Sequence, residues 1–249
     1  MKKAVVEKIA QVDFAGVVAD ELNLAINDFI EEKGFCTVVL AGGKTPSSSI
    51  YRSLSVPPRR DEIDWKKVKL FLDDERFVPF ESDQNNFKMI SETLISKLPQ
   101  QPEIVKIDTD NTTAEKSCNK YKEDIKKSMN LKEGELPVFD LVLLGIGKDG
   151  FTASIYPGAD LPEKNKDICY IVPESERSPY KRITLSSHVL FGAKKIFFIV
   201  CDEVKAEIVQ KVLEENHTPK EIPVMLYKNV EDRVTFFIGG AAVKNLKKI

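Results

Sequence analysis

The chain has few of the residues from which disulfide frameworks and metal centres are built. Its 249 residues contain four cysteines and two histidines. The cysteines are far apart and form no CxxC pair, so we expect buried, reduced thiols in place of disulfides or a structural zinc site. We predict no metal site.

An excess of one charge and a long apolar run are also missing. The 37 lysines and arginines nearly balance the 39 aspartates and glutamates, so nothing indicates a nucleic-acid-binding face. No apolar run approaches the ~20 residues that a membrane span requires, and charged residues interrupt the N-terminal segment where a signal peptide would have its apolar core. We therefore expect a cytoplasmic protein that binds neither nucleic acid nor membrane.

Short apolar runs alternate with helical patterns along the whole chain. Four runs are typical of buried parallel strands because they are rich in β-branched and aromatic residues, and they lie at 35–40, 68–72, 139–144 and 195–200. Weaker strands are expected at 4–9, 104–107, 169–172, 182–185, 224–226 and 234–238. Helices are expected at 14–32, 46–54, 85–98, 113–129 and 202–214. The alternation predicts βαβ crossovers and one α/β domain over residues 1–249, with a mostly parallel sheet flanked by helices.

In such sheets ligands bind beyond the carboxyl ends of the strands, and four loops at these ends carry unusual residues. The first is LAGGKTP at 40–46. Gly42 and Gly43 let backbone N–H groups approach a ligand closely, and Thr45 can cap the following helix, whose N-terminus suits phosphate. A plain strand-to-helix turn explains the same residues equally well.

The second loop, LDDERFVP at 72–79, has three carboxylates and an arginine directly after an apolar strand. Such charges face either a binding site or solvent. Arg76 suits a bidentate contact with a sugar phosphate or a carboxylate, with Asp73 or Glu75 to orient it. The alternative interpretation is a solvated acidic turn.

The third loop, GIGKDGFTASIYPG at 145–158, adds three more glycines near its start and the carboxylate of Asp149. The fourth, SPYKRITL at 178–185, contributes Arg182, and Lys205 follows in a later helical pattern. Each cation taken singly fits a surface charge. Together with two glycine loops they predict a pocket for a dianionic phosphosugar.

Four motifs, AGGKTP, DDERFVP with the later Asn85-Asn86, GIGKDGFTASIYPG and PYKRITL, occur in this order, and the chain thereby resembles the 6-phosphogluconolactonases. That family belongs to a wider group that includes the glucosamine-6-phosphate deaminases. The resemblance implies a Rossmann-like α/β fold and no obligatory cofactor. It also implies hydrolysis of 6-phospho-D-glucono-1,5-lactone to 6-phosphogluconate, in the oxidative pentose phosphate pathway. The expected partner is a phosphorylated sugar lactone or acid, and we expect a monomer or a weak homo-oligomer.

The resemblance also implies roles for individual positions. The loop glycines would belong to the substrate loop, Arg76 would contact the ligand, and two further cations would bind its phosphate. The residues expected to bind substrate or phosphate are Gly42, Gly43, Lys44, Thr45, Asp73, Arg76, Gly147, Arg182 and Lys205.

One position departs from the family pattern. Asp149 falls on the aspartate of the family's glycine-Asp-glycine-histidine element, and the histidine that serves as general base would be residue 151, which here is Phe151. Phenylalanine cannot accept a proton, and loss of a general base typically costs ~10²–10⁴ in rate. Asp149 is the expected replacement, because His188 should start a helix that leads away from the pocket and His217 should lie in a surface loop.

Three functions therefore remain open. The first is a lactonase, slowed or with a substituted base. The second is a phosphosugar-binding protein that has lost catalysis, which Phe151 favours. The third is a deaminase or isomerase, but that chemistry requires a carboxylate after the glycine-Asp-glycine-histidine element. Residues 153–157 read ASIYP and contain none, so the third is the least supported.

Overall fold

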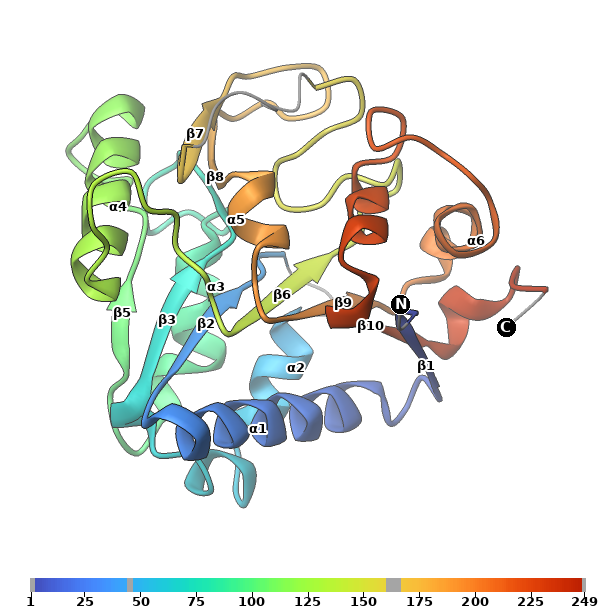
Figure 1. Cartoon of the computed structure of the whole chain (residues 1–249), viewed down its shortest axis with the longest axis horizontal. Helices are drawn as coiled ribbons and strands as arrows, with labels where there is room; N and C mark the ends of the chain where they lie inside the picture. The colour runs from blue at the N-terminus through green and yellow to red at the C-terminus, as the bar shows by residue number, and fades with distance from the viewer. Residues whose placement is uncertain (1–2, 44–46, 160–166, 248–249) are drawn as a thin grey trace.

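A seven-stranded parallel sheet forms the centre of the protein (Figure 1). The structure is a computed structural model that describes residues 3–43, 47–159 and 167–247. The strand order is β1-β10-β9-β6-β2-β3-β5, and every pairing is parallel. The strands are β1 (Val5–Ile9), β2 (Cys36–Leu40), β3 (Val68–Leu72), β5 (Glu103–Val105), β6 (Leu141–Gly145), β9 (Lys195–Val200) and β10 (Val234–Gly239). The predicted α/β class with a mostly parallel sheet is confirmed.

Helices cover the sheet, which explains the unbroken apolar runs in its central strands. All five residues of β2 are buried, as are the last five of β9. The helices are α1 (Phe14–Lys33), α2 (Ser47–Leu54), α3 (Asn86–Thr93), α4 (Ala114–Met129), α5 (Ser187–Phe191) and α6 (Ala206–Glu214). A strand buried on both faces has no polar side to alternate with, so its sequence is apolar throughout.

A second, smaller sheet lies directly beyond the carboxyl end of β3. It consists of β4 (Asp74–Arg76), β8 (Arg182–Leu185) and β7 (Cys169–Val172), in the order β4-β8-β7 and with antiparallel pairing. Its register places Arg76 opposite Arg182. Like charges in directly opposite positions destabilise a sheet, so this pairing requires anions nearby.

Three sequence predictions differ from the structure. The segment 224–226 is not a strand but part of a 3₁₀-helix, Pro223–Asn229, with Pro223 at its first position where the missing N–H costs nothing. The helix predicted at 85–98 ends at Thr93 and is followed by a separate 3₁₀ turn. The strand β4 was not predicted, because its three residues, Asp-Glu-Arg, are all charged.

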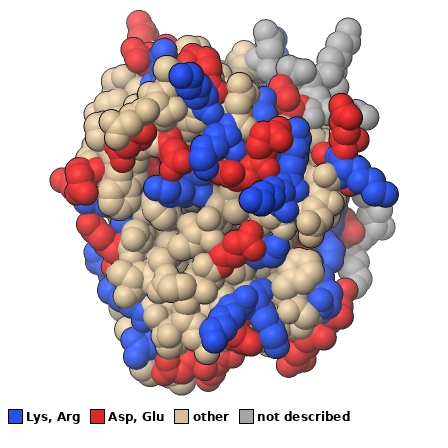
Figure 2. All heavy atoms as spheres, turned by 90° about the vertical axis from the view of Figure 1, so that its left-hand side faces the viewer, with Lys and Arg blue, Asp and Glu red and all other residues tan. Residues whose placement is uncertain are grey.

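The surface around α4 carries interspersed charges of both signs (Figure 2). Lys120 and Asp124 pair along the helix at 2.5 Å, and Lys126 pairs with Glu123 at 2.8 Å. All four cysteines are buried. No helix in the described ranges is long and apolar enough to cross a membrane.

Candidate active site

The loops that follow β2, β3 and β6 meet around a cavity of about 160 Å³. It also receives residues from β8 and from the turn before α6. Eight residues that the sequence singled out line it: Gly42, Gly43, Asp73, Arg76, Gly147, Phe151, Arg182 and Lys205. The cavity is smaller than the ~300–1,000 Å³ of most ligand sites, so a whole phosphosugar would extend through its mouth.

Three other predicted site residues, and His188, are not placed there. Lys44 and Thr45 lie outside the described residues. The exposed Asp149 does not line the cavity, and its Oδ2 pairs with Arg177 Nη1 at 2.8 Å. His188 is exposed on α5, which agrees with the prediction that it begins a helix.

A larger hollow, of about 450 Å³, lies between α4 and the edge strand β5. It has no predicted site residue in its lining, and its Lys69 Nζ pairs with Glu103 at 3.2 Å. The smaller cavity is therefore the better candidate for an anionic ligand.

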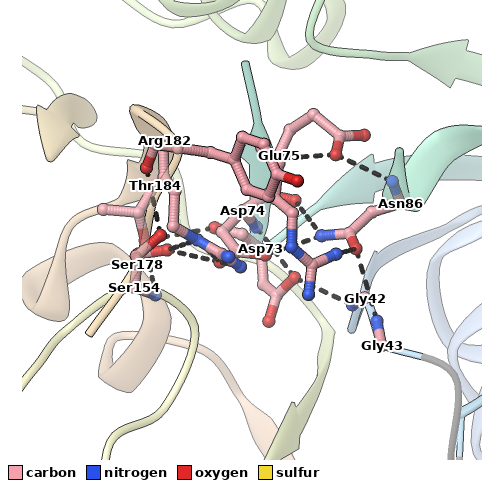
Figure 3. Close-up of polar contacts among 12 residues, drawn as sticks. Gly42, Gly43, Asp73, Asp74, Glu75, Asn86, Ser154, Ser178, Arg182 and Thr184 are labelled. Atoms are coloured by element: carbon pink, nitrogen blue, oxygen red, sulfur yellow. Dashed lines mark hydrogen bonds and ion pairs between the residues drawn. The ribbon is translucent and has the colours of Figure 1, made fainter. Parts of the chain in front are cut away.

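A buried ion pair forms one wall of the smaller cavity (Figure 3). Arg182 Nη2 lies 2.6 Å from Asp74 Oδ2, and Arg182 Nε lies 3.1 Å from the same oxygen. Ser154 Oγ donates to that oxygen at 2.5 Å. Asn86 Nδ2 donates to Asp74 Oδ1 at 2.9 Å. Burial lowers the pKa of Arg182, but the Asp74 carboxylate more than offsets this and keeps the pKa above its ordinary value.

Asn86, the first residue of α3, joins two of the loops, 40–46 and 72–79. Its Oδ1 accepts hydrogen bonds from Arg76 Nη1 at 2.9 Å and from Gly43 N at 3.4 Å. A Cβ on Gly42 would lie 2.1 Å from Asn86 Nδ2, so only glycine fits this close approach. Asn86 belongs to the motif that follows DDERFVP, but no role was predicted for it.

Glu75 is fully buried and does not line the cavity. Its Oε1 accepts from the backbone N–H groups of Arg76 and Asn86, and its Oε2 accepts from Phe87 N, each at 2.8 Å. Burial raises the pKa of Glu75 to about 7, and these hydrogen bonds offset the shift only in part. Glu75 therefore fixes the start of α3 beside β4, and it holds Arg76 through the backbone.

The ring of Phe151 forms another part of the wall. Gly147 N donates to Phe151 O at 2.8 Å, and a Cβ on Gly147 would lie 2.0 Å from the ring. The ring centroid is 5.1 Å from that of Tyr156. The position that the resemblance assigns to a general base is therefore occupied by an apolar ring at the cavity, packed on a glycine backbone.

The loop N–H groups expected to face a ligand are engaged by protein acceptors. Gly42 N donates to Asp73 Oδ1 at 3.2 Å, Gly43 N to Asn86, and Gly147 N to Phe151. In this conformation, recognition of an anion depends mainly on side chains.

Three cations are available for such recognition. Arg76, Arg182 and Lys205 all line the cavity, opposed there by the carboxyl groups of Asp73 and Asp74. Burial lowers the pKa of Lys205, and the nearby Asp202 opposes that shift; its Nζ donates to Ile146 O. The excess of positive groups suits a dianion such as a phosphate monoester.

A sequence model for glucosamine-6-phosphate isomerases/6-phosphogluconolactonase matches residues 10–236. The chain belongs to this family. It is 31% identical to a 6-phosphogluconolactonase of Thermotoga maritima over 92% of this chain and 94% of that one. It is 32% identical to 6-phosphogluconolactonase 3, chloroplastic, of Arabidopsis thaliana over 94% of this chain and 71% of that one.

Solved structures agree with this family assignment. The crystal structure of the Thermotoga maritima 6-phosphogluconolactonase superposes with a TM-score of 0.79 at 29% identity, over 95% of this chain and all of that one. A 6-phosphogluconolactonase from Trypanosoma brucei superposes with a TM-score of 0.85 over 99% of this chain and all of that one. Its identity is 24%, so it supports the fold alone. Phe151 therefore lies in a chain that belongs to this family and has its fold.

Proposed function

We propose that the protein hydrolyses 6-phospho-D-glucono-1,5-lactone to 6-phosphogluconate. The observation that carries the proposal is the convergence of Arg76, Arg182 and Lys205 on one cavity at the carboxyl ends of the parallel strands, in a chain of this family. The sequence alone left each of these cations open to interpretation as a surface charge. Their common cavity favours a shared anionic ligand.

The arginines have donors available for that ligand. Arg76 Nη1 is bound to Gln84 O and Asn86 Oδ1, but its Nη2 donates to no described residue. Arg182 uses Nε and Nη2, and its Nη1 likewise donates to none of the described residues. We assign these free donors to hydrogen bonds with the phosphate oxygens. The Lys205 ammonium group would neutralise the second negative charge of the phosphate.

The lactone ring would then lie toward Phe151. A lactone is an activated ester, and exclusion of water around a charged cavity strengthens every electrostatic contact in it. Phe151 itself neither donates nor accepts a proton, so hydrolysis requires a different proton acceptor. Cytoplasmic location and a monomeric or weakly associated state remain predictions from the sequence.

A phosphosugar-binding protein without catalysis is the second candidate, and Phe151 is the observation that favours it. The deaminase alternative has less support, because Ala153, Ser154 and Ile155 follow Phe151 where that chemistry requires a carboxylate.

An assay of lactone hydrolysis tests the proposal. A pH-stat measures the acid released, and the rate of the spontaneous reaction is subtracted. We expect the wild-type protein to hydrolyse the lactone faster than buffer does. Phe151→His should be faster than the wild type by up to ~10²-fold, which is the lower end of the usual contribution of a general base. A wild-type rate equal to that of buffer, with acceleration in Phe151→His, would instead identify a binding protein.

Calorimetric titration with 6-phosphogluconate tests the pocket separately. Arg76→Gln should weaken affinity by ~10–100-fold, because a charge-assisted hydrogen bond contributes about 1.5–3 kcal/mol. Arg177→Gln is the matched control, since Arg177 is exposed and lies outside the cavity lining. Equal affinities in the two variants would contradict the pocket assignment.

A further inference from the structure

Three consecutive acids, Asp73, Asp74 and Glu75, differ in how their oxygens are used. Both oxygens of Asp74 are bound, to Arg182, Ser154 and Asn86. Both oxygens of Glu75 accept backbone N–H groups. Neither group is free to react with a substrate.

Asp73 is different, because only one of its carboxylate oxygens is engaged. Its Oδ1 accepts from Asp74 N at 2.8 Å and from Gly42 N at 3.2 Å. Its Oδ2 receives no hydrogen bond from any described residue, and Figure 3 shows it directed away from the network that holds Oδ1. The side chain lines the cavity although the residue is only 3% exposed.

The backbone of Asp73 is held firmly in place. Asp73 N donates to Leu40 O at 3.1 Å, and Leu185 N donates to Asp73 O at 2.9 Å. These bonds tie the residue to β2 on one side and to β8 on the other. A reactive group on such a junction is oriented before the substrate arrives.

We propose that Asp73, through Oδ2, is the proton acceptor in the lactone hydrolysis, the role that Phe151 cannot fill. This inference rests on the proposed function. It replaces Asp149, whose carboxylate is exposed and paired with Arg177.

The proton transfers balance as follows. Water attacks C1 of the lactone, and the proton it loses passes to Asp73 Oδ2 as the new C–O bond forms. The tetrahedral intermediate collapses, the bond from C1 to the ring oxygen breaks, and the Asp73 carboxylic acid returns the proton to that oxygen. The carboxylate is regenerated, and the product acid releases its own proton to solvent.

The surroundings of Asp73 tune it for this role. Burial and the Asp74 charge raise its pKa well above the ordinary value, while two N–H donors and Arg182 oppose the shift. A carboxylate with a raised pKa is a better base near neutral pH. The titratable and charged groups around it are Asp74, Arg76, Arg182, Lys205, Tyr51 and Tyr121.

Asp73→Asn tests the inference, because asparagine keeps an oxygen for the two N–H donors but cannot accept the proton. We expect kcat to fall by ~10²–10⁴-fold with little change in KM. Affinity for 6-phosphogluconate should be retained, and adding Phe151→His to this variant should restore activity. Asp61→Asn, the same change at an exposed residue far from the cavity lining, is the control.

The possible results separate the two proposals. If the wild-type protein does not exceed buffer, the proposed function fails. If the wild type is active and Asp73→Asn retains its kcat, or if Asp149→Asn shows the large loss instead, the role of Asp73 is refuted. Should Asp73→Asn not fold, the wild-type profile decides: kcat should rise with pH through the raised pKa of Asp73, and a kcat that does not change with pH above the ordinary pKa range of a carboxyl group refutes the inference.

Discussion

The acidic segment at 73–76 and the glycine loop at 145–158 both border the cavity, but they contribute to it in different ways. In the acidic segment the side chains contact partners on α3, β8 and the loop after β6. In the glycine loop the backbone sets the geometry: Gly150 has φ +81° and Ala153 has φ +47°, both in the left-handed region. The acidic segment supplies charged side chains to the cavity, and the backbone of the glycine loop determines the course of its wall.

This difference matters because the histidine that the resemblance implies as general base would belong to the glycine loop. Here that loop presents the Phe151 ring to the cavity and its only carboxylate, Asp149, to solvent and Arg177. The charged groups that remain at the cavity are on β4 and beside it, on β8 and before α6. If the protein is a hydrolase, the acidic segment has to carry the proton transfer as well as the binding.

The largest effect on stability is expected from Asp74→Asn. Removal of this charge leaves the Arg182 guanidinium buried without its counter-ion, and breaking a buried pair typically costs about 3–5 kcal/mol. Urea unfolding measures the loss. A loss below ~1 kcal/mol, the range of exposed pairs, would show that the network is solvated and that the two regions do not differ as described.

A smaller effect comes from the pH dependence contributed by Glu75. Its pKa is about 7 in the folded protein and would be near 4.5 when unfolded, so the folded state binds the extra proton between these values. Stability from this group is therefore intact below about pH 4.5 and falls by about 3 kcal/mol as the pH rises to about 7. Glu75→Gln should remove this slope from a series of unfolding curves, and an unchanged slope would contradict the assignment.

The smallest effect is expected from Asp149→Asn, the matched change in the glycine loop and the control for Asp74→Asn. The pair with Arg177 is exposed on both sides, and such pairs contribute about 0.2–1 kcal/mol. The same urea titration should show a shift within this range. A loss as large as that of Asp74→Asn would mean that the loop depends on its carboxylate as much as the acidic segment does.

Sequence patterns predicted the main strands of the sheet well, because these depend on residues that are neighbours in the sequence. The apolar runs at β2, β3, β6 and β9 were predicted as covered strands because they are short and rich in β-branched and aromatic residues, and the structure confirms them. The glycines at 42 and 147 were expected to bring backbone N–H groups close to a ligand, whereas the structure shows close approaches to Asn86 and Phe151. The strand predicted at 224–226 was wrong because Pro223 and a short apolar run fit a 3₁₀ turn as well.

The sequence by itself determined that this chain is an α/β protein with charged and glycine-rich loops at the ends of its strands, since periodicity and composition act over a few residues. Only the tertiary structure decided what each acid in the run 73–75 does. Asp74 meets Arg182 across 108 positions of sequence, Glu75 is enclosed by α3, and Asp73 retains one oxygen for the cavity. Burial and the identity of distant partners set the charge and reactivity of a carboxylate, and neither can be read from its sequence neighbours.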